Sequence, residues 1–410
     1  PNTFALFLLV CELLIIFKTK FKAIDYISLA ILIGGILYTG SRTAFLLFII
    51  SNFIAILFNA NKKFRLTIIG GAVAVLAVVF IIAFFGPEGN VLSRYLKFGL
   101  SESTFVGRLL YLVDALPLII KYPFGMGYMG YQFIQGSIQT GVYNVAFAHN
   151  EFLQLFLDVG IIPAVVFICA IIKFFLKKHI SFSKKIIVAV VCLHSLFDFN
   201  FQFLAIFMLL LLLCEDENEQ RIIIEKNTIY KTLLIIFALV NLYMSASLSL
   251  AHFGAHEVAD TLFPYNTRNT LNMLNKEENI DRSNELADRI LKQNKHYYAP
   301  YSVKSKYAYS EGNFAQVIEN KNATFERMPF RYTEYTEYCV MLINGITAYE
   351  NIGDSESADI CKKELLKTKS KLESASEKLS DFGSMIDEQP TTQLPSDILH
   401  YIENMKMGAK

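Results

Sequence analysis

The sequence predicts an all-α protein, in which a polytopic bundle of transmembrane helices is followed by a soluble helical domain. Of its 410 residues, 53% are hydrophobic and only 18% are charged, and the mean hydropathy is +0.38. A soluble domain of this composition would expose too much apolar surface. The long apolar runs are confined to residues 1–250, whereas residues 251–410 are polar and show helical spacing. We therefore expect a multi-pass membrane domain over the first range and a soluble domain over the second.

Apolar segments that can cross a membrane need about 20 mostly apolar residues. The candidates are residues 2–17, 24–40, 43–58, 66–85, 151–172, 186–199, 201–214 and 232–250. Lysine and arginine gather in the loops after the first, third and fifth segments, and such loops face the cytoplasm. This topology places a large loop, 86–150, and the domain 251–410 outside the cytoplasm. The net charge of +1 gives no reason to expect a nucleic-acid partner.

The large loop 86–150 is too long for a plain connector, and loops of this length usually carry function. Residues 103–120 predict an amphipathic helix along the membrane, with Arg108 near its start. A glycine-rich bend follows, in which Gly125 and Gly127 permit tight turns. Such a bend can offer backbone N–H groups to an anion, or it can only shape the turn.

Ionisable and polar side chains gather on the outer face of the predicted membrane domain. They are Arg42, Arg94, Arg108, His149, Asn150, His194 and Asp198, and Arg94 fits a membrane anchor better than a catalytic role. Ionisable groups at membrane depth are costly and therefore indicate function. Arginines that face a histidine indicate a phosphate-bearing substrate, because arginine binds phosphate through two N–H groups and histidine is the usual general base. Structural roles are the alternative: an arginine can anchor a helix at the membrane edge, and His194 can pin two helices together.

Four segments, in this order, resemble the O-antigen ligase and polymerase superfamily. They are SRTAFL at 41–46, GRLLYLVDALPLIIKYPFGMGYMGY at 107–131, AHNEFLQLFLDVGIIPA at 148–164 and HSLFDFNFQF at 194–203. The His-Asn segment is the most specific of them, and the resemblance covers about residues 1–215. Compared with this family the chain has fewer spans, so we expect an odd number of spans upstream of residue 1.

The resemblance implies a glycosyltransferase of the bacterial cytoplasmic membrane that uses an undecaprenyl-diphosphate-linked glycan, inverts the anomeric carbon and needs no metal or other cofactor. By this resemblance Arg42 and Arg108 bind the diphosphate. His149 orients or deprotonates the acceptor hydroxyl, which belongs to a lipid, a protein or a surface polymer. The supporting residues would be Asn150, His194, Asp198, Gly125 and Gly127. A polymerase of lipid-linked repeat units is the alternative enzyme, and a transporter or membrane-anchored interaction protein is the non-enzyme alternative.

The C-terminal domain shows helix–turn–helix patterns that resemble tetratricopeptide units. Residues 298–319 turn at Gly312, and residues 337–365 turn at Gly353. The spacing of these turns exceeds the usual period of roughly 34 residues, so a generic helical bundle is the alternative. In either case we expect a platform for a protein partner and a flexible tail from about Asp381 on. Two cysteines of this domain, at positions 339 and 361, can pair only in an oxidising compartment.

Overall fold

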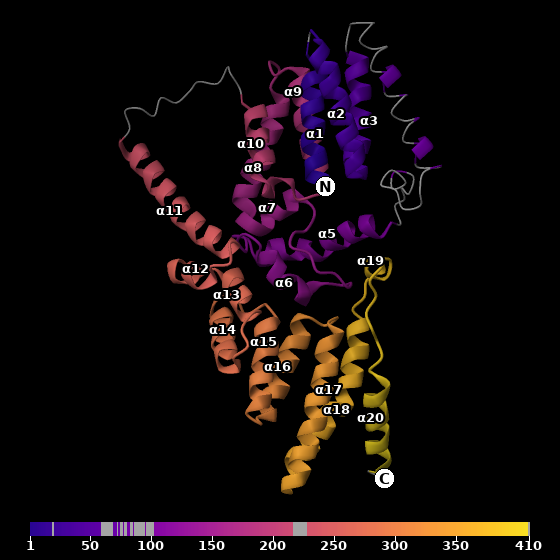
Figure 1. Cartoon of the computed structure of the whole chain (residues 1–410), viewed down its shortest axis with the longest axis vertical. Coiled ribbons are helices and arrows are strands. Elements are labelled where there is room, and N and C mark those ends of the chain that lie inside the picture. Colours follow the sequence, from indigo (N-terminus) through magenta and orange to yellow (C-terminus); the bar gives the residue numbers. More distant parts are fainter. Residues whose placement is uncertain are drawn as a thin grey trace. The chain divides into compact units, whose positions relative to one another are not determined.

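The computed structural model describes residues 1–18, 20–58, 102–215 and 228–408, with residue 95 and scattered residues between 69 and 85. The described residues form helices, and no strand occurs among them. The predicted all-α fold class is therefore confirmed (Figure 1). The number of spans and the side of the membrane on which each loop lies remain predictions.

Two compact units divide the chain. Unit 1 comprises Pro1–Gln132, Val145–Asn218 and Met385–Asp387, and unit 2 comprises Phe133–Asn144, Glu219–Ser384 and Glu388–Lys410. This division differs from the boundary expected at residue 250. Part of the large loop clusters with unit 2, where Phe133 packs edge-on against Tyr297 with ring centroids 5.2 Å apart.

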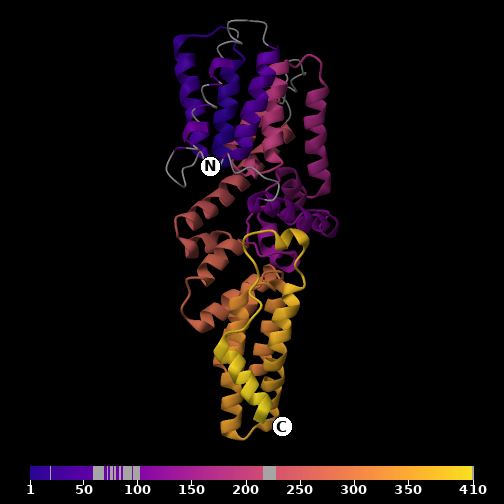
Figure 2. The ribbon, with the colours of Figure 1, turned by 90° about the vertical axis from the view of Figure 1, so that its right-hand side faces the viewer.

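Unit 1 holds most of the apolar helices. They are α1 (Asn2–Ile16), α2 (Ala23–Thr39), α3 (Arg42–Phe58), α5 (Ser103–Lys121), α7 (Glu151–Val159), α8 (Ile161–Leu176), α9 (Phe182–Ser195), the 3-10 turn η2 (Asn200–Gln202) and α10 (Leu204–Leu213). Helix α6 (Gly130–Ile138) begins in unit 1 and ends in unit 2. Helix α1 packs on α2, α3 and α9, and these helices lie side by side in Figures 1 and 2.

The core of this bundle is aliphatic. Leu6, Leu9 and Leu13 of α1 meet Val188 and Val191 of α9, and all five side chains are buried. Between helices that lipid surrounds, such contacts stabilise through close packing and dispersion, because lipid tails are as apolar as leucine. The bundle is thus built as the composition of its segments predicts.

The predicted spans agree with the helices in most places. By length and composition alone, α5 and α11 (Thr228–His252) are long and apolar enough to cross a membrane, and α1, α2, α3, α8 and α10 are shorter apolar helices. Residues 151–172, expected as one span, form two helices, because Gly160, with φ +88°, separates α7 from α8. The predicted span 66–85, Arg94 and most of the loop 215–227 fall largely or wholly outside the described residues.

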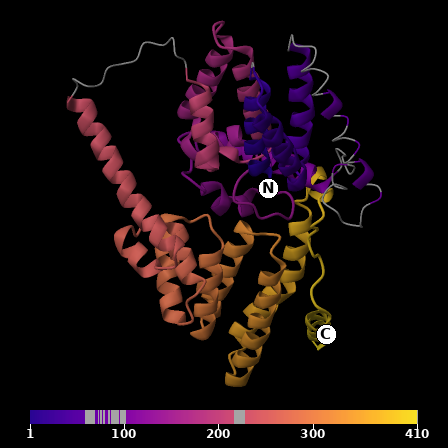
Figure 3. The same cartoon turned by 45° about the horizontal axis from the view of Figure 1, so that its top comes forward.

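Unit 2 is a row of helices in which each packs on the next along the chain. They are α11, α12 (His256–Leu262), α13 (Thr267–Leu274), α14 (Ile280–Gln293), α15 (Ala299–Ser310), α16 (Phe314–Arg327), α17 (Tyr332–Ile352) and α18 (Ser355–Ser376). Helices α19 (Asp381–Ser384) and α20 (Ser396–Gly408) follow. Figure 3 shows this row in colours from salmon to yellow. The two predicted helix–turn–helix pairs are confirmed as α15–α16 and α17–α18, whereas the tetratricopeptide assignment stays a prediction.

The turns between the paired helices follow directly from two dipeptides. Gly312 and Gly353 adopt φ +69° and +77°, a left-handed conformation that favours glycine after a helix end. The next residues, Asn313 and Asp354, accept N–H groups of the first turn of α16 and α18 through their side chains. Each Gly-Asx pair therefore ends one helix and caps the next.

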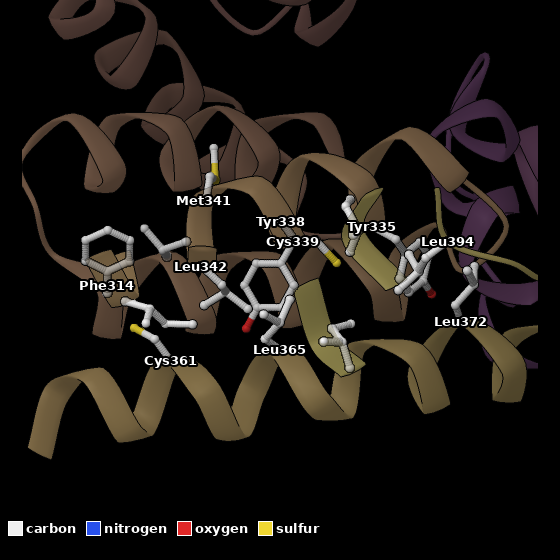
Figure 4. Close-up of a cluster of buried hydrophobic side chains, with 14 of the residues drawn as sticks. Phe314, Tyr335, Tyr338, Cys339, Met341, Leu342, Cys361, Leu365, Leu372 and Leu394 are labelled. Atoms are coloured by element: carbon white, nitrogen blue, oxygen red, sulfur yellow. The ribbon is translucent and has the colours of Figure 1, made fainter. Parts of the chain in front are cut away.

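An aromatic and aliphatic core joins α15–α18 to the end of the chain (Figure 4). Tyr338 and Leu342 of α17 are fully buried in it. Ile398 and Ile402 of α20 pack into the same core, so the prediction of a flexible tail from Asp381 is wrong. Both cysteines of unit 2 lie in this core as free thiols.

Candidate functional site

His149 lies directly before α7 with an unusual backbone conformation. Its φ is +51°, and a residue with a Cβ atom adopts this conformation at a cost of roughly 1–3 kcal/mol, mostly at functional sites. The ring packs edge-on against Phe199 at 4.9 Å and lies 5.9 Å from the ring of Tyr111. Its Nδ1 atom is 3.5 Å from Oδ1 of Asp198. The imidazole therefore turns one nitrogen toward a carboxylate, and Nε2 lies on the other side of the ring.

Hydrogen bonds with the first turn of α7 fix the residues on both sides of His149. Asn150 is the N-cap of α7, and its Oδ1 accepts the N–H of Leu153 at 3.0 Å. Gln154 Oε1 accepts the N–H of Ala148 at 2.9 Å. Asn150 thus acts on the histidine through the backbone, as the cap of the helix that follows it.

Asp198 follows α9 and is buried. Its Oδ1 accepts the N–H of Phe199 at 2.9 Å. Glu151, which is fully buried at the start of α7, accepts the N–H of Phe201 at 3.0 Å and the side-chain amide of Gln202 at 2.8 Å. Glu151 thereby ties the 3-10 turn after Asp198 to the helix that follows the histidine.

His194, near the end of α9, is fully buried and is held by an asparagine. Asn200 Nδ2 is 2.9 Å from His194 Nδ1 and donates also to Ser195 Oγ at 3.0 Å. Because an amide nitrogen only donates, Nδ1 accepts and the neutral ring carries its proton on Nε2. This Nε2 has no hydrogen-bond partner among the described residues.

The two arginines come from different helices and lie close together. Arg42 is the first residue of α3; its Nη1 donates to Glu102 Oε2 at 2.8 Å, and its Nη2 donates to Thr104 Oγ1 at 2.7 Å. Arg108 lies one turn after Thr104 on the same face of α5. It is near enough to Asp198 and Arg42 to interact with them electrostatically. The arginines and the histidine–carboxylate pair therefore form one cluster within unit 1.

The glycine-rich bend packs its backbone against the end of α7. Gly125 has φ +81°, and a Cβ atom there would lie 2.5 Å from the carbonyl oxygen of Asp158. The N–H groups of Met126 and Gly127 donate to the carbonyls of Leu157 and Asp158 at 2.6 and 3.1 Å. The bend thus uses these two N–H groups to brace the end of α7. The turn-shaping alternative is the one that the structure supports.

Sequence reasoning missed several residues that hold the cluster together. Glu151 and Gln154 are buried polar residues within an apolar run, which is a visible signal of function or packing. Glu102 and Asn200 gave no such signal, because their partners lie on other segments. Glu102 and Asn200 hold predicted residues, Gln154 holds the backbone beside His149, and Glu151 holds the turn that follows Asp198.

The cluster combines a base with charges that can stabilise an anion. A histidine beside a carboxylate can take a proton from a hydroxyl, since the carboxylate stabilises the imidazolium that forms. Two guanidinium groups can bind and stabilise a phosphorylated leaving group. Deprotonation of a hydroxyl and departure of an anion are thus possible in the same place.

Comparison with known proteins places this cluster in a family context. Residues 27–168 match the family model described as O-antigen ligase. No curated protein and no solved structure matches the chain. The match supports the resemblance to the O-antigen ligase superfamily, and it indicates a membrane protein that processes lipid-linked glycans. The matched stretch includes Arg42, Arg108 and His149 and ends before His194 and Asp198.

Proposed function

We propose that this chain transfers a glycan from an undecaprenyl-diphosphate carrier to an acceptor hydroxyl on the outer face of the bacterial cytoplasmic membrane. The observation that carries the proposal is the convergence of Arg42, Arg108, His149 and Asp198 from four separate segments of unit 1. Their chemistry is that of phosphate binding and base catalysis. The family match over residues 27–168 supports the same assignment.

On the donor side, Arg42 and Arg108 bind the diphosphate. Guanidinium groups stay charged even when partly buried and bind phosphate oxygens in pairs. As the bond between the anomeric carbon and the diphosphate oxygen breaks, its electron pair moves onto the diphosphate. Fixed positive charges stabilise this developing negative charge more than the ground state, and so they accelerate the reaction.

On the acceptor side, His149 takes the proton of the attacking hydroxyl at Nε2. Its Nδ1 faces Asp198, which fixes the ring and stabilises the imidazolium, as carboxylates do for catalytic histidines in other enzymes. The hydroxyl oxygen then forms a bond to the anomeric carbon from the side opposite the diphosphate. A single displacement of this kind inverts the anomeric carbon.

A ligase and a polymerase share this chemistry and differ in the acceptor. In a polymerase the acceptor is the glycan of a second carrier lipid, whereas a ligase uses a separate lipid, protein or surface polymer. We favour transfer to a separate acceptor, because unit 2 adds a long row of stacked helices of the kind that serves as a binding platform. Ladders of repeat units on the carrier lipid would instead identify a polymerase.

The test is transfer by the purified full-length protein in lipid bilayers. The donor is an undecaprenyl-diphosphate glycan, and washed membranes of the producing bacterium supply the acceptor. His149→Ala should lower the transfer rate roughly 10²–10⁴-fold, because the general base is removed, and Arg108→Ala should lower it and weaken donor binding. The matched controls are His400→Ala and Arg282→Ala, which change an exposed and a partly exposed residue of unit 2. Transfer at the wild-type rate by both site variants would exclude the proposed site.

A further inference from the structure

Glu102 holds a residue that the proposed function assigns to the substrate. Its carboxylate accepts a hydrogen bond from Arg42 Nη1 at 2.8 Å, across 60 positions of sequence. The two side chains are 20% and 35% exposed. This ion pair therefore lies where water and a soluble head group can reach it, and it can exchange partners.

The same guanidinium also contacts a hydroxyl. Arg42 Nη2 donates to Thr104 Oγ1 at 2.7 Å, and Thr104 shares a face of α5 with Arg108. A carboxylate and a phosphate can each bind a guanidinium through two oxygens, in the same geometry. Glu102 thus presents an anion to Arg42 beside a hydroxyl donor and close to a second guanidinium, which is the setting that a phosphoryl group requires.

We propose that Glu102 occupies one phosphoryl position of the donor site and that the donor diphosphate displaces it from Arg42, with the Thr104 hydroxyl as a further ligand of the diphosphate. This inference rests on the proposed function. Glu102 then lowers the affinity for every diphosphate that enters, because each must break the ion pair. After transfer the carboxylate returns to Arg42 and helps to expel the lipid diphosphate that remains.

The Arg42–Glu102 ion pair is partly exposed, and this exposure limits how strongly Glu102 lowers the affinity for a diphosphate. Partly exposed ion pairs contribute little stability, because water screens them. Glu102 is therefore a competitor and does not close the site. Glu102→Gln should lower the Kd for a diphosphate roughly fivefold, since it removes the ion pair and the repulsion between two anions.

The experiment measures binding, so it does not depend on an acceptor. The probe is farnesyl diphosphate, titrated into the full-length protein in detergent micelles and followed by calorimetry. Glu102→Gln is expected to bind more tightly than wild type, and Thr104→Val roughly tenfold more weakly, because a hydrogen bond to a charged group is lost. The control is Glu285→Gln, which makes the same change in net charge on an exposed pair of unit 2 and should leave the Kd unchanged.

Arg42→Gln separates this inference from the proposed function. Unchanged probe binding by Arg42→Gln would contradict the role of Arg42 and so the proposed donor site itself. Weaker binding by Arg42→Gln, together with unchanged or weaker binding by Glu102→Gln, would overturn only the role of Glu102. In the double variant the gain from Glu102→Gln should vanish, because the competition needs both side chains. Should Glu102→Gln fail to fold, Glu102→Asp, whose carboxylate falls short of Arg42, carries the same expectation and the same outcome that overturns it.

Discussion

Two buried polar clusters, one in each unit, have different surroundings. In unit 2, Lys321 is fully buried, and its Nζ lies 2.7 Å from Glu334 and 2.6 Å from Glu337. In the site of unit 1, His194 Nε2 is buried without a hydrogen-bond partner among the described residues, and the carboxylate that faces the buried Nδ1 of His149 is 3.5 Å away. The buried charge of the first cluster is satisfied within the protein, whereas the second cluster contains a buried ring nitrogen that is not.

This difference separates a scaffold from a site. A buried donor or acceptor without a partner costs roughly 1–3 kcal/mol. Selection for stability alone would therefore provide such partners in both clusters. The Lys321 cluster has these partners, and it links α16 to α17. In unit 1, Nδ1 of His149 faces Asp198 and its Nε2 is left for the acceptor hydroxyl, which agrees with the function proposed for this residue.

One substitution can break the buried ion pairs of Lys321. Lys321→Ala leaves two carboxylates of α17 without their buried partner, and breaking a buried ion pair in this way costs roughly 3–5 kcal/mol. We expect a large loss of amide protection in α16 and α17, measured by hydrogen exchange, with farnesyl diphosphate binding retained. The control is Lys362→Ala, which breaks the more exposed pair with Glu350. A loss of protection no larger than in this control would contradict the scaffold role of Lys321.

The histidine site of unit 1 can be disturbed through a residue that does not contact the substrate. Glu151→Gln replaces one of the two oxygens that hold the turn Asn200–Gln202 by an amide, which cannot accept. We expect kcat to fall roughly tenfold, because Asp198 loses its fixed position opposite His149. The Kd for farnesyl diphosphate should stay unchanged, since the arginines lie on other helices. A parallel loss of kcat and donor affinity would show that Glu151 serves the whole fold of unit 1.

The sequence predicted the helices better than the long-range contacts that they make. Apolar composition identified α1, α2, α3 and α11, and the Gly-Asx turns identified the helix pairs of unit 2. The break at Gly160 was missed, because it depends on backbone packing: a Cβ atom there would lie 2.6 Å from the carbonyl oxygen of Pro123. The tail was misread because its polar, proline-containing stretch outweighed Ile398 and Ile402, whose i, i+4 spacing indicates a helix.

The site shows the same limit. Residue type and membrane context were enough to select Arg42, Arg108 and His149, since charged groups are rare there. The partner of Arg42 lies 60 positions away, and the partner of Glu151 lies 50 positions away. No local pattern encodes such pairs, because they follow from helix packing. The geometry that makes Glu102 a competitor was therefore beyond the sequence.

The smallest expected effect concerns the pH dependence of unit 2. Burial opposes ionisation of Glu337, but the charges and hydrogen bonds of Lys321 and Lys306 outweigh it and hold the pKa of this carboxyl below its ordinary value of 4.5. A group whose pKa is lower in the folded state adds stability that is fully present above the unfolded value and is lost as the pH falls through the folded value. The melting temperature of unit 2, followed by far-UV circular dichroism, should therefore fall as the pH drops below about 4.5. Glu337→Gln should melt lower than wild type at pH 7 and show a flatter pH dependence, and two parallel curves would contradict this origin of the stability.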